Sequence, residues 1–283
     1  MKRADRWVLV ALAVFCLAGL GGCGPLPGSS DSAAQTSAVP TPTPVSTPKP
    51  EHVLPPGFSE RMRFEADTDG DGQLDIIVLA LTADDEAQIG LLKTDGYDYI
   101  AAGEGTFTDA HIAATPNGAP CVLVTSDLGS DDYVTRVVAF SANTPELKGE
   151  AIAYVEEAEG AHVVLASVTE AIGSWFYTRE YMLSESFALE PVSEMRIDAQ
   201  AAEPLHTIRT LPVEVLLDGE YAADTLPADM LLYPTATDGK TYLSFTLEDG
   251  TEGRVLFTRG EDYMTQINGL PEEDYFDNLD YWD

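Results

Sequence analysis

The chain has 283 residues, of which 15 are basic and 48 acidic, so its formal net charge is −33. A surface this acidic repels a phosphate backbone, so the composition argues against a nucleic-acid partner and suits a protein that binds cations. With 45% hydrophobic residues, the chain can bury a sizeable core and has room for one large or two modest domains.

Residues 1–22 have the features of an export signal. The basic start consists of Lys2, Arg3 and Arg6. An apolar run of fourteen residues follows at 7–20, which is short for a membrane-spanning helix and typical of a signal-peptide core. We therefore expect this segment to be removed during export.

The residues Leu20-Gly21-Gly22-Cys23 end the signal segment and resemble the lipobox of bacterial lipoproteins. The resemblance implies that Cys23 receives a diacylglyceryl thioether and becomes the first residue of the mature chain. It also implies a membrane partner through this lipid anchor, at the extracellular face of a bacterial cell membrane. The alternative is a plain secretory signal in which Cys23 is incidental.

The cysteine count agrees with an exported chain that has no disulfide. Cys16 lies in the signal segment and Cys23 in the lipobox, so only Cys121 remains in the mature chain. Cys121 begins an apolar run at 121–124, which predicts a small buried thiol in a strand.

Residues 23–58 are predicted to be a disordered tether that follows the lipidated cysteine. Nine of the eighteen prolines fall in 24–58, among many Ser, Thr and Ala residues that cannot build a core. An extended polyproline chain of this length reaches about 100 Å, at about 3.1 Å per residue. Such a reach would carry the folded part into a cell wall, which points to a Gram-positive cell.

Residues 59–200 are predicted to form repeated β units. Apolar, β-rich runs at 74–83, 120–126 and 161–169 each follow a polar or glycine turn and precede a second strand pattern. Their centres, near Ile76, Val122 and Val163, are 46 and then 41 residues apart, a period typical of a four-stranded propeller blade. The predicted fold class is therefore all-β, with propeller-like or partial-propeller β repeats.

Three repeats are too few to close a propeller, which has four to eight blades. The repeats could form a partial propeller, a sandwich, or a propeller completed by strands that come later in the chain. Residues 205–283 are predicted to be a small C-terminal β module with a hairpin at Asp249-Gly250. Pro271 and the acids after it predict a short terminal helix, whose inner face would carry Tyr275, Phe276 and Leu279.

The sequence DTDGDGQLD at 67–75 has the ligand spacing of a calcium loop. Positions 1, 3, 5, 7 and 9 of such a loop fall on Asp67, Asp69, Asp71, the Gln73 carbonyl and Asp75. Gly72 falls on position 6, where the chain turns sharply. Position 12 is Val78 instead of a bidentate Glu, and both flanks are strand-like, so the loop is not an EF-hand.

The segment FEADTDGDGQLDIIV at 64–78 resembles instead the calcium loop of FG-GAP and VCBS repeats, found in integrin-type β-propellers. The resemblance implies one bound Ca²⁺ with Asp67, Asp69, Asp71, Asp75 and the Gln73 carbonyl as ligands. The corresponding turns of the other two repeats lack the aspartates. The alternative is a metal-free hairpin rich in turn-forming Asp and Gly, although carboxylates this close repel each other without a cation.

The remaining sequence offers no catalytic constellation. The histidines are isolated, and there is no H-E-x-x-H, G-x-S-x-G or phosphate-loop motif. We therefore expect a binding or structural lipoprotein and not an enzyme, with an extracellular protein or a glycan as its ligand. The alternative is an extracellular hydrolase or glycan-processing accessory protein that uses an acidic pair such as Asp131 and Asp132.

Overall fold

The computed structural model describes residues 53–129, 132–141, 143–198, 202–260 and 264–281, and it is all-β. The predicted signal segment, the predicted lipidation site Cys23 and the tether up to residue 52 lie outside the described residues. Within the part that is described, no helix has the length and apolarity needed to cross a membrane.

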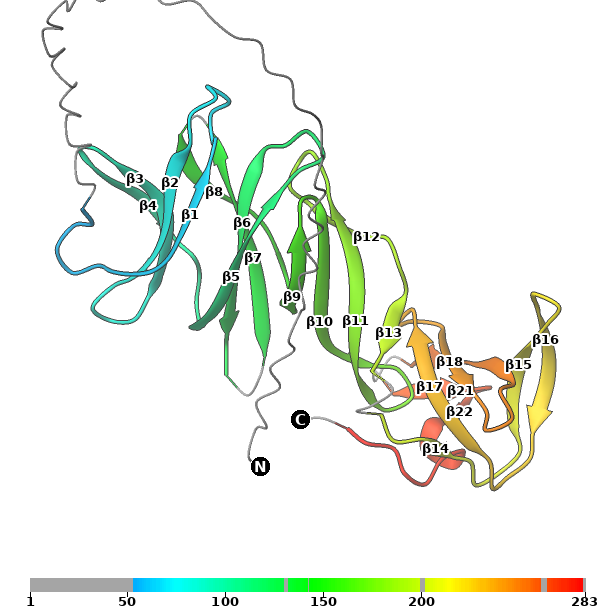
Figure 1. Cartoon of the computed structure of the whole chain (residues 1–283). Helices are drawn as coiled ribbons and strands as arrows, with labels where there is room; N and C mark the ends of the chain where they lie inside the picture. Colours follow the sequence, from blue (N-terminus) through cyan, green and yellow to red (C-terminus); the bar gives the residue numbers. More distant parts are fainter. Residues whose placement is uncertain (1–52, 130–131, 142, 199–201, 261–263, 282–283) are drawn as a thin grey trace, which may run out of the picture. The chain divides into compact units, whose positions relative to one another are not determined.

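The first two sheets are four-stranded antiparallel meanders, with their strands in sequence order (Figure 1). The strands of the first sheet are β1 Ser59–Ala66, β2 Asp75–Leu81, β3 Ala87–Lys93 and β4 Gly96–Ala101. Those of the second are β5 Thr106–Ala114, β6 Pro120–Asp127, β7 Tyr133–Ser141 and β8 Thr144–Ala151. The apolar runs predicted at 74–83 and 120–126 are the second strand of each sheet, so the spacing indicated a four-stranded unit correctly.

The third repeat begins in the same way and then differs. Its strands are β9 Tyr154–Glu159, β10 His162–Glu170, β11 Ser174–Leu183, β12 Leu189–Pro191 and β13 Met195–Ile197. Strand β13 pairs with β11 on one side and with β17 on the other. The third repeat therefore continues into the C-terminal strands as one eleven-stranded sheet.

The C-terminal strands complete this sheet and add a small three-stranded one. They are β14 Leu205–His206, β15 Leu211–Leu217, β16 Glu220–Leu226, β17 Leu231–Thr237, β18 Tyr242–Thr246, β19 Glu252–Leu256, β20 Thr258–Arg259, β21 Thr265–Ile267 and β22 Leu270–Pro271. The predicted hairpin is confirmed: it joins β18 to β19, and Asp249 Oδ1 accepts a hydrogen bond from Thr251 N at 2.9 Å.

Strand β6 is buried on both faces, which explains its continuous apolar sequence. Val122 and Val124 pack in the cluster shared with the first sheet, whereas Cys121 and Leu123 pack in a second cluster with the third repeat. Burial raises the pKa of the Cys121 thiol to about 12, so it stays protonated and inert. The prediction of a buried strand thiol is confirmed.

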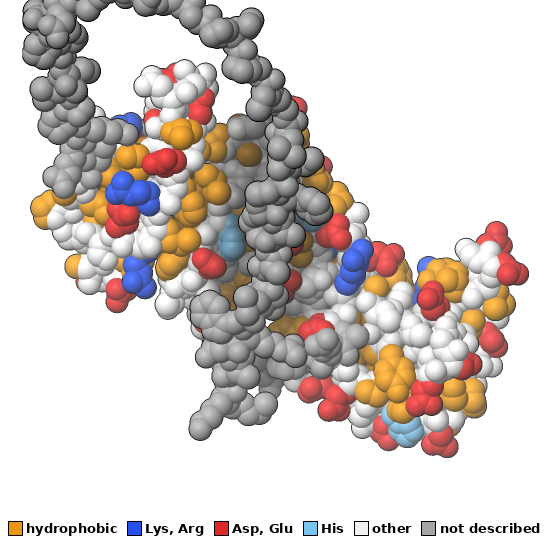
Figure 2. Space-filling view, in the orientation of Figure 1, with side chains coloured by type: hydrophobic (Ala, Val, Ile, Leu, Met, Phe, Trp, Pro, Cys, Tyr) orange, Lys and Arg blue, Asp and Glu red, His pale blue; other side chains and the backbone are white. Residues whose placement is uncertain are grey.

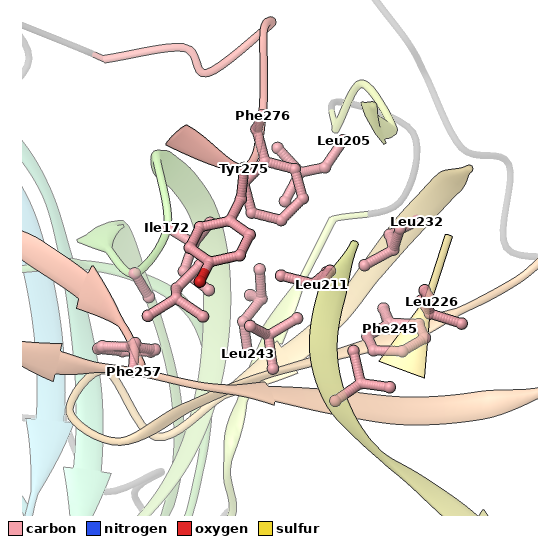
Figure 3. Packing of buried hydrophobic residues seen from close by; sticks show 14 of the residues in the cluster. Ile172, Leu205, Leu211, Leu226, Leu232, Leu243, Phe245, Phe257, Tyr275 and Phe276 are labelled. Atoms are coloured by element: carbon pink, nitrogen blue, oxygen red, sulfur yellow. The ribbon is translucent and has the colours of Figure 1, made fainter. Parts of the chain in front are cut away.

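A third core fills the C-terminal region. Phe245, Leu211 and Leu243 lie at its centre, and Tyr275 and Phe276 reach it from the end of the chain (Figure 3). These last two follow a 3₁₀ helix, η1 Glu272–Asp274, and are 3% and 2% exposed. Leu279 packs against the same core. The predicted helix is thus only a single 3₁₀ turn, and the three apolar side chains reach the core from beyond its end and not from a helical face.

Glu272, the first residue of η1, is a buried carboxyl that joins two distant segments. Gly173, in the turn between β10 and β11, donates its N–H to Glu272 Oε2 at 3.1 Å. The Tyr281 hydroxyl donates to Oε1 at 3.0 Å. Burial raises the pKa of Glu272 to about 7, and the neighbouring Glu273 adds to the rise.

The raised pKa of Glu272 predicts a pH-dependent stability. Folding favours the protonated acid, so its contribution is complete below the unfolded pKa near 4.5 and is lost as pH rises through about 7. Glu272→Gln mimics the protonated acid, so we expect its melting temperature relative to wild type to rise between pH 5 and pH 8. Circular dichroism melts across this range measure the difference. Glu185→Gln, in the exposed turn between β11 and β12, should track wild type, and parallel curves for Glu272→Gln would contradict the prediction.

Candidate metal centre

The aspartate-rich loop joins β1 to β2, and the pairing of Ala66 with Asp75 closes it at the base. Gly70 and Gly72 have φ angles of 78° and 84°, in the left-handed region that glycine adopts without strain. The two glycines therefore let the chain fold back tightly enough to bring the aspartates together.

Three of the five predicted ligands converge. One carboxylate oxygen from each of Asp67, Asp69 and Asp71 lies within 4.8 Å of the other two. Oxygens bound to one calcium ion at about 2.3–2.6 Å lie at most about 5 Å apart, so the spacing and the hard-oxygen donors fit this ion. Asp67 is half-buried, and the other two are exposed.

Backbone N–H groups organise the loop around these carboxylates. Asp67 Oδ1 accepts from Gly70 N at 2.8 Å, and its Oδ2 accepts from Gly72 N at 2.9 Å. Asp71 Oδ1 accepts from Gln73 N at 2.7 Å. These donors hold the side chains in place and offset part of their mutual repulsion.

Asp75 and Gln73 have other partners. Asp75 Oδ2 accepts from Thr68 N at 3.1 Å and lies 2.5 Å from Thr68 Oγ1. The Gln73 side chain donates from Nε2 to Asp71 Oδ2 at 3.0 Å. The acidic group that could hold a metal ion consists of Asp67, Asp69 and Asp71, and Asp75 is not part of it.

Asn143 is a contact of the loop that sequence reasoning missed. It lies in the turn between β7 and β8, on the second sheet, and its Nδ2 donates to Asp69 Oδ2 at 2.6 Å. Its Oδ1 is 2.9 Å from the hydroxyl of Thr68, a residue only 7% exposed. The loop is thereby tied to the neighbouring sheet. No sequence signal links residues 74 positions apart.

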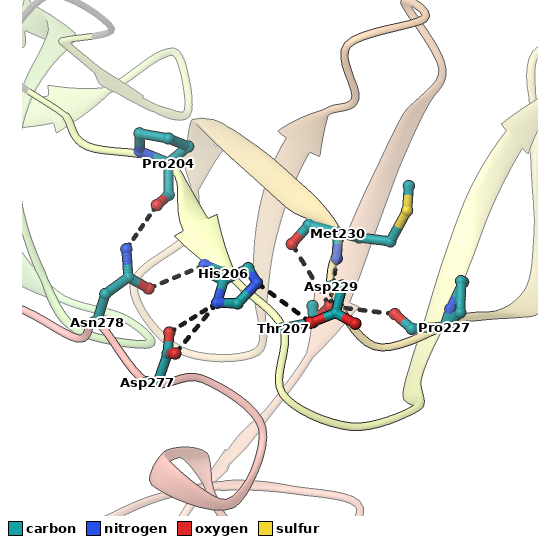
Figure 4. A network of polar contacts seen from close by, with 8 residues as sticks. All are labelled: Pro204, His206, Thr207, Pro227, Asp229, Met230, Asp277 and Asn278. Atoms are coloured by element: carbon teal, nitrogen blue, oxygen red, sulfur yellow. Dashed lines mark hydrogen bonds and ion pairs between the residues drawn. The ribbon is translucent and has the colours of Figure 1, made fainter.

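His206 has structural surroundings. His206 Nδ1 lies 3.0 Å from Asp277 Oδ1, and its backbone N–H donates to Asn278 Oδ1 at 2.8 Å (Figure 4). His206 Nε2 is 3.7 Å from Asp229 Oδ1, so the ring fastens the C-terminal segment beside β14. Of the acidic pair considered for hydrolysis, Asp131 lies outside the described residues. In the described ranges, Asp67, Asp69 and Asp71 are the only group with metal-ligand geometry.

Comparisons with known proteins found no match: no family model, curated protein or solved structure matches the chain.

The Thr68 contacts predict that its hydroxyl stabilises the loop. Thr68→Val keeps the shape and removes the hydroxyl between Asp75 and Asn143, so we expect the free energy of unfolding to fall by about 1–2 kcal/mol. Urea denaturation measures the change. Thr94→Val, in the exposed turn between β3 and β4, is the matched control and should change it by less than about 0.5 kcal/mol.

The link to the second sheet also predicts coupling. Thr68→Val and Asn143→Ala remove two ends of one contact, so their effects on unfolding should be non-additive. Strictly additive effects would show that the turn and the loop do not act together.

Proposed function

We propose that the chain is a lipid-anchored, calcium-stabilised protein of the extracellular face of a bacterial cell membrane, with a binding or structural role. The observation that carries the proposal is the convergence of Asp67, Asp69 and Asp71 in a loop tied to the next sheet through Asn143. A bound calcium ion would offset the repulsion among these carboxylates and so stabilise the junction between the two sheets.

The geometry of equivalent turns supports a propeller-like arrangement of the repeats. The turns that follow the first strand of each repeat meet around one cavity of about 310 Å³, lined by Asp67, Gly118 and Gly160 among others. Ala114 N donates to Gly160 O at 2.9 Å, which joins the second and third of these turns directly. Propeller blades place corresponding loops on one face in this way.

The partners that fit this role are the membrane, through a lipid on Cys23, and an extracellular protein or glycan ligand. The high acidity of the chain remains an argument against nucleic acid. The hydrolase alternative has no specific observation in its favour among the described residues.

Calcium removal is the first test of the proposal. With a dissociation constant of about 0.1 mM and about 2 mM free calcium, linkage gives about 1.8 kcal/mol of stabilisation. We therefore expect a chelator to lower the melting temperature by several degrees, and magnesium to restore it poorly. Differential scanning calorimetry and metal analysis of the purified protein measure both.

Asp71→Ala should largely abolish the calcium response. It also relieves carboxylate repulsion, so without calcium the variant could melt slightly above wild type. Asp95→Ala, in the exposed turn between β3 and β4, is the control and should leave the calcium response intact. Purified wild type that contains no calcium and melts identically with and without chelator would overturn the metal proposal.

Lipidation is the second test. Wild-type protein should partition with membranes and carry acyl chains on Cys23 by mass spectrometry, whereas Cys23→Ala should carry none. Cys16→Ala, within the signal segment, should behave as wild type. Wild type found wholly in the culture medium without acyl chains would instead identify a plain secretory signal.

A further inference from the structure

A second candidate site lies at the other end of β2 from the aspartate loop. There, a cavity of about 750 Å³ opens between the first two sheets, beside Leu81, Ala87 and Phe107. Its walls are the turn between β2 and β3, the linker between β4 and β5, and Arg61 of β1. A volume of this size accommodates a small organic molecule.

The linker wall has a fixed conformation. Gly103 and Gly105 have φ angles of 107° and 100°. A Cβ on Gly103 would approach the Arg136 guanidinium to 2.2 Å, and one on Gly105 would approach the Asp127 carbonyl to 2.6 Å. Arg136 is 8% exposed and donates from Nη1 to the Glu104 carbonyl at 3.2 Å. The backbone at Glu104 is therefore held at the cavity by packing that does not depend on a ligand.

The opposite wall is also ordered by its own hydrogen bonds. Thr82 Oγ1 accepts from Asp84 N at 3.3 Å and from Glu86 N at 3.2 Å. Thr82 N donates to the Glu86 carbonyl at 3.0 Å, which closes the turn. A site formed before its ligand arrives loses less entropy when the ligand binds.

The charge of the cavity is strongly one-sided. Four carboxylates line it against a single guanidinium: Asp84, Asp85, Glu86 and Glu104 face Arg61. Two acids elsewhere in the first sheet are in ion pairs, Glu60 with Arg63 at 2.7 Å and Asp98 with Lys93 at 3.1 Å. Among the described residues, none of the four cavity side chains has such a cationic partner. A cleft lined by charge of one sign concentrates counter-ions.

The arrangement of these groups separates an organic cation from a bare metal ion. The cavity carboxylates do not form a cluster of ligand atoms like that of Asp67, Asp69 and Asp71. Apolar Leu81 and the half-buried Phe107 ring add surface that a hydrated metal ion would not use. An aromatic ring also attracts an ammonium or guanidinium group through its π face.

We infer that this cavity binds an organic cation that carries an amino or guanidinium group on a compact apolar body. The site is distinct from the aspartate loop and requires neither calcium nor the lipid anchor.

The test uses the purified full chain in low-salt buffer with three matched probes. 2-Phenylethylamine is the cation, 2-phenylethanol its neutral analogue and 3-phenylpropionate an anion. Saturation-transfer NMR and calorimetric titration should show saturable binding of the amine, and binding at least about tenfold weaker for the other two. Absence of saturable amine binding, or equal or tighter binding of the anion, would overturn the inference.

Variants locate the site. Glu86→Gln combined with Glu104→Gln should weaken amine binding about tenfold by removing two of the four carboxylates. Arg61→Gln removes the one opposing charge, so it should tighten amine binding about twofold or more. Glu157→Gln combined with Glu159→Gln, on exposed positions of β9, changes the net charge as much as the first pair and should leave binding within about twofold.

Two variant outcomes would contradict the assignment. An equal loss in the β9 pair would show that the amine responds to overall charge and not to the cavity. Weaker amine binding in Arg61→Gln would show that the guanidinium attracts the probe. The inference predicts the opposite, because an ammonium group and a guanidinium group are both cations and repel each other. All substituted side chains lie on the surface, and their melting curves verify that folding is unchanged.

Discussion

Burial of β6 on both faces is the constraint on which the rest of the structure depends. One face packs against the first sheet through Val122 and Val124, and the other packs against the third repeat through Leu123. A strand placed in this way has no side open to water, so every residue from 121 to 124 must be apolar. The aspartate loop and the acidic cavity both lie where the first sheet packs against the sheet that contains β6. The geometry of both therefore depends on this packing.

The two ends of β2 use acidic residues differently, although acidic side chains are scattered over the face drawn in Figure 2. At the Asp75 end, three carboxylates converge, and backbone N–H groups hold them in place. At the Leu81 end, the carboxylates are spread around an apolar floor. Convergent oxygens suit a small hard cation, whereas dispersed ones suit a larger organic cation. Placement, more than the amount of charge, therefore distinguishes the two proposed sites.

Local sequence signals predicted local structure well, because turns and strand patterns depend on neighbours in the chain. The Asp249-Gly250 hairpin and the apolar strand at β6 were predicted correctly for this reason, whereas the helix predicted after Pro271 is a single 3₁₀ turn. The long-range contacts could not be predicted in this way. Asn143 meets Asp69, and β13 pairs with β17, through packing that no local pattern records. The cavity was missed as well, since loops from separate strands build its walls.

The continuity of the eleven-stranded sheet also depends on contacts between residues that are far apart in the sequence. Strand β13 pairs with β17 through only two residues, so this pairing alone is a narrow connection. The end of the chain reinforces it: Ser174 N donates to the Asp280 carbonyl at 2.8 Å, beside the bond from Gly173 to Glu272. Gly173 has a φ of 81°, and a Cβ there would lie 3.2 Å from the Asp280 carbonyl. Asp280 and Glu272 therefore help to hold the third repeat to the C-terminal strands.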